Sequence, residues 1–131
     1  MDDWRKPHPC GLHLTPDLLE ASYEYLRLSP PFRAWNLPEG DQISFRVMGA
    51  RDRFGHFRGR HTKARGADSF SEIAISAGKV RSTDVLMATM AHEMIHLYQD
   101  ENGWARGHHN PQFRALAARV CAIHGFDPEN F

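Results

Sequence analysis

Apolar residues at helical spacing predict an amphipathic helix near the start of the chain. Thr15 is suited to cap this helix, Pro16 to occupy its first position and Asp17 to bring a favourable charge to its first turn. The Ser-Pro-Pro sequence at residues 29–31 cannot continue the helix. The residues expected to face the core are Leu18, Leu19, Tyr23 and Leu26.

The next part of the chain has the pattern of strands. Residues 42–48 alternate between apolar and polar side chains, which is typical of a half-buried strand. Residues 53–58 and 70–76 follow as two further strands. We expect these three strands to form a small, mostly antiparallel sheet.

Two more helices follow the strands. Ser82 can cap the first of them, and apolar residues cover so much of its surface that a largely buried helix is expected. Asn110 can cap the second, which is expected to run from Pro111 to about His124, where a glycine ends it. This order of elements predicts an α+β domain with an N-terminal helix, a three-stranded sheet, a buried helix and a closing helix.

Length and composition are those of one compact domain. The chain has 131 residues and no low-complexity linker, so we expect a single domain over residues 1–131, of which residues 1–14 are an N-terminal extension. The formal net charge is zero at pH 7, which argues against nucleic-acid binding through the overall field. No secretory signal or membrane-spanning run is visible, so a cytoplasmic location is expected. Cys10 and Cys121 form no C-x-x-C pair, and Cys121 is expected to lie in the core.

The most specific chemical signal is the sequence HEMIH at residues 92–96, within the helix expected to be buried. Two histidines four residues apart lie on the same face of a helix, where both can bind one zinc ion. Glu93 lies on the adjoining flank, where it can take a proton from a water that the metal has made acidic. The spacing therefore predicts hydrolase chemistry, with His92 and His96 as metal ligands and Glu93 as the general base. The alternative is a pair of histidines that merely hydrogen-bond within a core.

A catalytic zinc needs a third protein ligand and one open position. Gln99 and Asn102 stand where a metzincin has glycine and histidine, and residues 111–125 contain no carboxylate for a thermolysin-like site. The remaining candidates are His108 and His109. His109 is favoured, because it directly precedes the capped start of the last helix, which fixes its backbone. His108 would then be a neighbouring or solvent-facing residue.

These two segments resemble the SprT-like metallopeptidase family. That family has the pattern H-E-x-I-H, followed after a loop by a histidine and then Gly-x-x-Phe or Gly-x-x-Trp. Here the second segment is GHHNPQF at residues 107–113, with Asn110 in place of the usual glycine, and both residues are acceptable caps. A weaker similarity includes residues 54–57 and 71–76, so that the resemblance covers most of the chain from about residue 15 onward.

The resemblance implies a small zincin-like domain that binds one zinc ion per chain through His92, His96 and His109 and hydrolyses peptide bonds. Glu93 would take a proton from the zinc-bound water, whose pKa is lowered toward about 7, and pass it to the leaving amine. For the best-known members, the family also implies cleavage of proteins on or crosslinked to DNA. The implied partners are a protein or peptide substrate and DNA, preferentially single-stranded, with a nucleoid location as the alternative. An extended substrate could pair with an exposed strand edge, for which residues 70–76 are the candidate.

Residues 51–66 are strongly basic for a chain of zero net charge. Aromatic residues and histidines lie between the cations, which is typical of a surface that contacts phosphates and stacks on bases. The alternative is an edge strand made soluble by charge, with Phe54 or Phe57 facing the core. His56 and His61 are expected to be structural or solvated. The candidate nucleic-acid contacts are Arg51, Arg53, Arg58, Arg60, Lys63 and Arg65.

Two other functions are compatible with the sequence. In a non-catalytic module, zinc would support the fold while residues 51–66 recruit DNA or a protein partner. A structural zinc would have a fourth protein ligand, and no residue offers itself, so the presence of Glu93 favours an enzyme. Hydrolysis of a non-peptide amide would use the same ligands. Arg106, in the loop before the third histidine, would either stabilise an oxyanion or lie at the surface.

Overall fold

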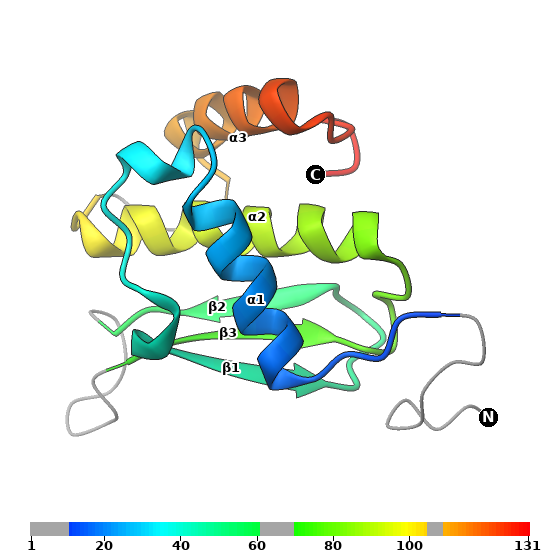
Figure 1. Cartoon of the computed structure of the whole chain (residues 1–131). Coiled ribbons are helices and arrows are strands. Elements are labelled where there is room, and N and C mark those ends of the chain that lie inside the picture. The colour runs from blue at the N-terminus through cyan, green and yellow to red at the C-terminus, as the bar shows by residue number, and fades with distance from the viewer. Residues whose placement is uncertain (1–10, 61–69, 105–108) are drawn as a thin grey trace.

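The computed structural model describes residues 11–60, 70–104 and 109–131. Three helices and a three-stranded sheet form the predicted α+β domain. In Figure 1, α1 and α2 lie on one face of the sheet and α3 lies beyond α2, so that α2 is the middle layer. The elements in chain order are α1 (Pro16–Arg27), the short 3₁₀ turns η1 (Phe32–Ala34) and η2 (Gly40–Gln42), β1 (Ile43–Met48), β2 (Gly55–Arg58), β3 (Ser71–Ser76), α2 (Thr83–Glu101) and α3 (Pro111–His124).

The sheet is mixed, whereas a mostly antiparallel sheet was expected. Its strand order is β1-β3-β2. At Ile73, β3 has Phe45 of β1 beside it in the parallel direction and Phe57 of β2 beside it in the antiparallel direction. The reason is topological. The chain reverses between β1 and β2, so a strand inserted between these two must run parallel to one of them.

The position of β3 also corrects the expectation that residues 70–76 offer an exposed edge to a substrate. Ala74 of β3 has Arg46 on one side and His56 on the other, so β3 is paired along both edges. Among the strands that the structure describes, β2 is the outer strand on the side of β3 opposite to β1. An open edge next to α2 therefore belongs to β2.

The core fills the space between the sheet and the helices, and α2 contributes most to it. Apolar residues of α2 are fully buried on several sides, as the broad apolar surface in its sequence predicted. Phe57 packs against this core, whereas Phe54 is 46% exposed. The largest fully buried side chains are Leu19, Tyr23, Leu26, Phe32, Ile73, Ile75, Val80, Leu86, Met90, Met94, Ile95 and Leu97.

The ends of α1 and α3 agree with the capping signals in the sequence. The Thr15 hydroxyl accepts a hydrogen bond from the Leu18 amide at 3.1 Å. Asn110 Oδ1 accepts one from the Phe113 amide at 2.8 Å, and Pro111 follows at the first helical position. Gly125 ends α3 with φ of 78°, a left-handed conformation that glycine adopts without strain. The start of α3 is thus fixed locally, which matters for the residue that precedes Asn110.

None of the helices within residues 11–60, 70–104 and 109–131 combines the length and the apolar character that crossing a bilayer requires.

Candidate metal centre

Three histidines converge where α2 faces the start of α3. His92 and His96 lie one turn apart on α2, and their ring centroids are 5.2 Å apart. His109, just before α3, lies 4.8 Å from the His92 ring and 5.4 Å from the His96 ring. Each residue of this histidine cluster offers a nitrogen, and these nitrogens lie within 4.8 Å of one another. The cluster joins two residues of α2 to the residue that directly precedes the N-cap of α3.

The geometry and the donor set fit a zinc ion. Zinc binds imidazole nitrogen at about 2.0–2.1 Å, so two bonds span at most about 4.2 Å. Small rotations of the rings therefore bring three nitrogens that lie within 4.8 Å of one another to a single ion. Only the neutral form of imidazole is a ligand. Burial, together with the nearby His109, lowers the pKa of His92 to about 4. Burial and the neighbouring histidines do the same for His96, so both rings are neutral at neutral pH.

Two aromatic residues hold the rings of the cluster in place. Phe113, the third residue of α3, lies 4.3 Å from the His109 ring and 4.6 Å from the His96 ring, stacked on both. His92 Nδ1 donates a hydrogen bond to the main-chain carbonyl of Phe131 at 3.0 Å. A proton held on Nδ1 leaves Nε2 as the nitrogen available to a metal.

Glu93 is the carboxylate next to the cluster. It is 5% exposed, and this burial raises the pKa of its carboxyl to about 8. Gly55, the first residue of β2, packs against it: a β-carbon at position 55 would lie 3.2 Å from Glu93 Oε2 and 2.9 Å from the Ala74 carbonyl oxygen. Glycine thus lets the backbone of β2 approach the carboxylate closely.

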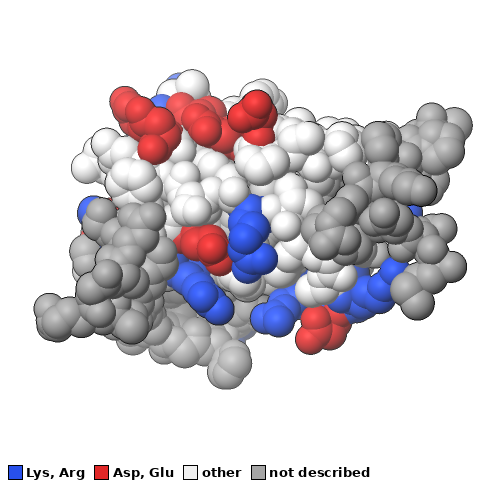
Figure 2. All heavy atoms as spheres, turned by 90° about the horizontal axis from the view of Figure 1, so that it is seen from below, with Lys and Arg blue, Asp and Glu red and all other residues white. Residues whose placement is uncertain are grey.

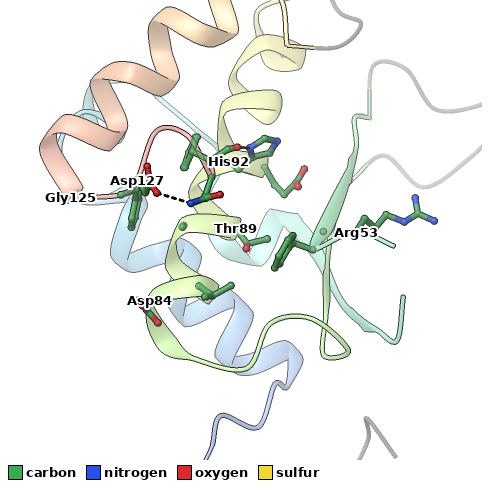
Figure 3. A pocket seen from close by; sticks show the side chains of 14 residues that line it. Arg53, Asp84, Thr89, His92, Gly125 and Asp127 are labelled. Atoms are coloured by element: carbon green, nitrogen blue, oxygen red, sulfur yellow. Dashed lines mark hydrogen bonds between the residues drawn. The ribbon is translucent and has the colours of Figure 1, made fainter. Parts of the chain in front are cut away.

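His92 and Glu93 lie in the wall of an open cleft of about 740 Å³. In Figure 3, Thr89 and His92 of α2 point into it, Gly125 and Asp127 lie on the side of α3, and the guanidinium of Arg53 points away. Phe54 and Gly55 form the side of β2. The remaining lining residues are Asp84, Val85, Ala88, Phe126, Asn130 and Phe131. A cleft bounded by β2, α2 and the segment after α3 is open enough for a peptide chain.

The arginines of the basic segment that the structure describes, up to Arg60, do not gather into one surface. Arg60 pairs with Glu101 of α2 through two hydrogen bonds of 2.9 and 3.0 Å, so its guanidinium is engaged. Arg53 is 3.6 Å from Asp52. Arg51 and Arg58 are exposed, and neither has an ion-pair partner among the described residues. Figure 2, which views the molecule from below the sheet, shows cations scattered among acidic and uncharged residues.

Other candidate residues have structural positions or lie outside the described part of the chain. His56 bonds Glu72 through Nε2 at 2.8 Å, away from the residues that line the cleft. Burial alone would raise the pKa of Glu72, but the hydrogen bonds from His56 and Arg46 lower it. Cys121 is buried at 4% exposure, as expected. Outside the described residues lie His61, Lys63, Arg65, Arg106, His108 and Cys10.

Sequence reasoning did not assign a role to several residues around the cluster. Gln99 lies one turn beyond His96 on the same face of α2, so its spacing from the two histidines could have indicated that it lies beside them. Phe113 was visible in the second motif but had no assigned function. The approach of Phe131 and Gly55 to the site depends on tertiary structure, and no local pattern in the sequence indicates it.

The fold and the site together define a class of protein: an α+β domain in which an H-E-x-x-H helix and a histidine ahead of the next helix converge on one metal-binding position. The profile of the SprT-like family matches residues 32–130, which include the whole sheet, α2 and α3. The chain therefore belongs to the SprT-like family. Neither the curated proteins nor the solved structures provided a match.

Proposed function

We propose that this chain is a zinc-dependent peptidase in which the histidine cluster holds the metal and Glu93 acts as the general base. The proposal rests on three imidazoles that converge beside a buried carboxylate, with His92 and Glu93 in the wall of an open cleft. Members of the SprT-like family are generally zinc metallopeptidases, which supports the same conclusion. Zinc is preferred to softer or harder cations, because three neutral imidazoles are a typical donor set for a catalytic zinc.

Glu93 supplies what the histidine cluster lacks, a proton acceptor. Zinc bound by the cluster would provide a Lewis acid and a water that is acidic near neutral pH. Glu93 would accept a proton from that water and return it to the amine that leaves when the peptide bond breaks. Burial raises the pKa of Glu93 to about 8 and so brings its basicity close to the working pH, where proton transfer in both directions is most efficient.

An extended substrate is best accommodated along β2. The main-chain amide of Ser76 donates a hydrogen bond to the Phe54 carbonyl at 2.8 Å. Along an antiparallel pair of strands, residues that hydrogen-bond to the partner strand alternate with residues that do not. The main-chain groups of Gly55 and Phe57 should therefore face away from β3, where a peptide can pair with them. Such a peptide would pass Glu93, against which Gly55 packs. Only every second amide of the substrate would hydrogen-bond to β2. N-methylation of these amides in a cleaved peptide should therefore abolish cleavage, whereas N-methylation of the amides between them should not. Equal effects at all positions would exclude this mode of pairing.

Apolar residues outside β2 line part of the cleft, among them Val85 and Ala88 of α2 and Phe131. We expect it to favour peptides with a bulky apolar side chain beside the cleaved bond, because burial of such a side chain contributes roughly 1.5–3 kcal/mol. Ala88→Trp should fill part of this space. It should reduce kcat/KM more for a leucine-containing peptide than for its alanine analogue, and an equal reduction for both would argue against this recess.

Glu93→Gln tests the proposed function most directly. The amide has the size of the carboxylate but accepts no proton, so zinc should remain at one per chain while cleavage of an unfolded protein falls by about 10²- to 10⁴-fold. Glu72→Gln is the matched control, since Glu72 is a half-buried carboxylate outside the cleft, and this variant should stay active. A wild-type protein without zinc, or a Glu93→Gln variant with wild-type activity, would refute the proposal.

Proteins bound or crosslinked to DNA are the substrate class that we propose, on the strength of the exposed Arg51 and Arg58 and the family resemblance. Single-stranded DNA should then accelerate cleavage of a DNA-binding protein more than cleavage of a protein that does not bind DNA. The second candidate function is a zinc-stabilised module that recruits DNA or a protein without hydrolysis. Robust DNA binding without cleavage of any substrate, in a chain loaded with zinc, would favour the module.

A further inference from the structure

Gln99 extends the metal-binding face of α2 by one turn beyond His96. Residues 92, 96 and 99 are spaced by four and three, so the side chain of Gln99 points in the same direction as those of the two histidines. The residue is only 3% exposed. A buried amide must be hydrogen-bonded, because an unsatisfied one keeps the full cost of its lost contacts with water. Its partners therefore indicate what it does.

Among the described residues, the partners of the Gln99 side chain belong to the start of α3. Its Nε2 donates to Gln112 Oε1 at 3.0 Å and to Asn110 Oδ1 at 3.3 Å. Asn110 Oδ1 also accepts the cap hydrogen bond from the Phe113 amide at 2.8 Å. One oxygen atom thus ties α2 to α3 and closes the first turn of α3 at the same time.

The backbone of Gln99 holds the other end of the same loop. Its carbonyl accepts a hydrogen bond from the Trp104 amide at 3.0 Å, where the chain leaves α2. Asn110, which the side chain of Gln99 holds, is where the chain enters α3. His109 lies directly before Asn110, and its ring stacks on Phe113 at 4.3 Å. Gln99 therefore fixes both ends of the loop that carries the third histidine.

We infer that Gln99 and Asn110 form an amide clamp that positions His109 for metal binding. The inference rests on the proposed metal site, since the clamp acts on its third ligand. A glycine at position 110 could cap α3 but would offer no side-chain oxygen to Gln99. Gln99 and Asn110 are positioning residues, which act through His109 and need not touch the ion or the substrate.

The test measures zinc affinity by competition with a chromophoric chelator, together with the visible spectrum of the Co²⁺-loaded protein. Gln99→Leu removes the donor at similar volume, and Asn110→Gly removes the acceptor but keeps a capping residue. Either variant should weaken zinc binding by roughly 10- to 100-fold, as loss of an outer-shell contact typically does. The Co²⁺ spectrum should change as well. Asn110→Asp, which keeps an oxygen acceptor, should restore affinity, and Gln112→Ala, which leaves the Asn110 contact, is the matched control and should remain close to wild type.

A double variant separates a clamp from two unrelated stabilising contacts. Gln99→Leu and Asn110→Gly break the same contact, so their combination should bind zinc no more weakly than the worse single variant. Zinc affinity within twofold of wild type in both single variants, or losses that multiply in the double variant, would overturn the clamp. Circular dichroism of the metal-free variants checks that they fold. Asn110→Gly alone decides the question if Gln99→Leu does not fold.

These outcomes are independent of peptide hydrolysis. If wild type binds zinc but cleaves nothing, the proposed function fails while the clamp can still be measured. If His109→Ala binds zinc as tightly as wild type, the clamp has no ligand to position and the inference is overturned.

Discussion

The face of α2 that carries His92, His96 and Gln99 and the basic segment from Arg51 to Arg60 differ in how firmly their side chains are held. On α2, His92 is bonded to the Phe131 carbonyl, His96 is stacked on Phe113 and Gln99 is bonded to the start of α3. In the basic segment, the arginine side chains are exposed and go in different directions, and Arg60 turns back to pair with Glu101. The side chains of the first region converge on one point, and those described in the second do not.

The difference follows from backbone geometry. A helix returns each side chain to the same direction after three or four residues, so groups with that spacing meet in space. In a strand, neighbouring side chains point to opposite faces, and in a loop no direction repeats. A cluster of charges along a loop and a short strand therefore does not become a cluster on the surface. The following predictions exploit this contrast, beginning with the largest effect.

His96→Ala should remove the metal, whereas Arg58→Ala should not affect it. Loss of one of three imidazoles leaves two, which hold zinc poorly, so zinc per chain should fall well below one. Activity should fall by about 10³-fold or more, since metal and base act as a unit. Elemental analysis and a protease assay measure both effects. Comparable losses of zinc in His96→Ala and Arg58→Ala would contradict the contrast between the two regions.

Removal of the charge of Glu93 should stabilise the metal-free protein at high pH. The fold raises the pKa of Glu93 from an ordinary 4.5 to about 8, so the native state binds more protons than the unfolded state between these values. The contribution of Glu93 to stability is therefore fully present below about pH 4.5 and is lost as the pH rises through 8. In EDTA, Glu93→Gln should unfold at a higher temperature than wild type. The gain in free energy of unfolding should grow between pH 5 and pH 8 and reach about 2–4 kcal/mol.

The same measurement must allow for the histidines, which act in the opposite sense. The fold lowers the pKa of His92 and His96 from 6.5 to about 4, so their contribution to stability is lost as the pH falls through this interval. Both proteins contain these histidines, so the histidine contribution cancels when the stability of wild type is subtracted from that of Glu93→Gln at each pH. A difference that does not change with pH would show that Glu93 is not desolvated.

Gly59→Ala should destabilise the fold where the basic segment meets α2. Gly59 follows β2 and is buried, and a methyl group there would overlap the carboxylate of Asp100, which is only 1% exposed. We expect a loss of about 1–3 kcal/mol in urea unfolding, because one of two buried groups must move. Gly103→Ala is an informative control: no atom of the described residues lies within 4 Å of where its β-carbon would be, so its cost should come from the φ of 66° and be smaller. Equal costs would show that Asp100 can move freely.

The helices, the strands and the shared face of His92 and His96 could be predicted from the sequence, because they follow from local spacing. The caps at Thr15 and Asn110 set the starts of α1 and α3, and the four-residue spacing of His92 and His96 set their common face. The mixed sheet could not be predicted, since alternation reveals a strand but not its neighbours. The packing of Gly55 on Glu93 likewise depends on strand order, so the edge that borders the cleft became known only from the fold.

Substitutions in the basic segment should have the smallest effects, and these should appear in DNA binding. The effects should differ clearly between Arg60 and the arginines for which the structure describes no ion pair. Arg51 and Arg58 are exposed and free of ion pairs among the described residues, so each can neutralise one phosphate. Either alanine substitution should reduce the salt dependence of single-stranded DNA binding by about one unit of slope. Arg60→Ala should change it little, because its guanidinium is held by Glu101. Fluorescence anisotropy over a range of salt concentrations measures these slopes. If Arg60→Ala reduced the slope as much as Arg58→Ala, the pair with Glu101 would have to open on binding, and the basic segment would act as one surface after all.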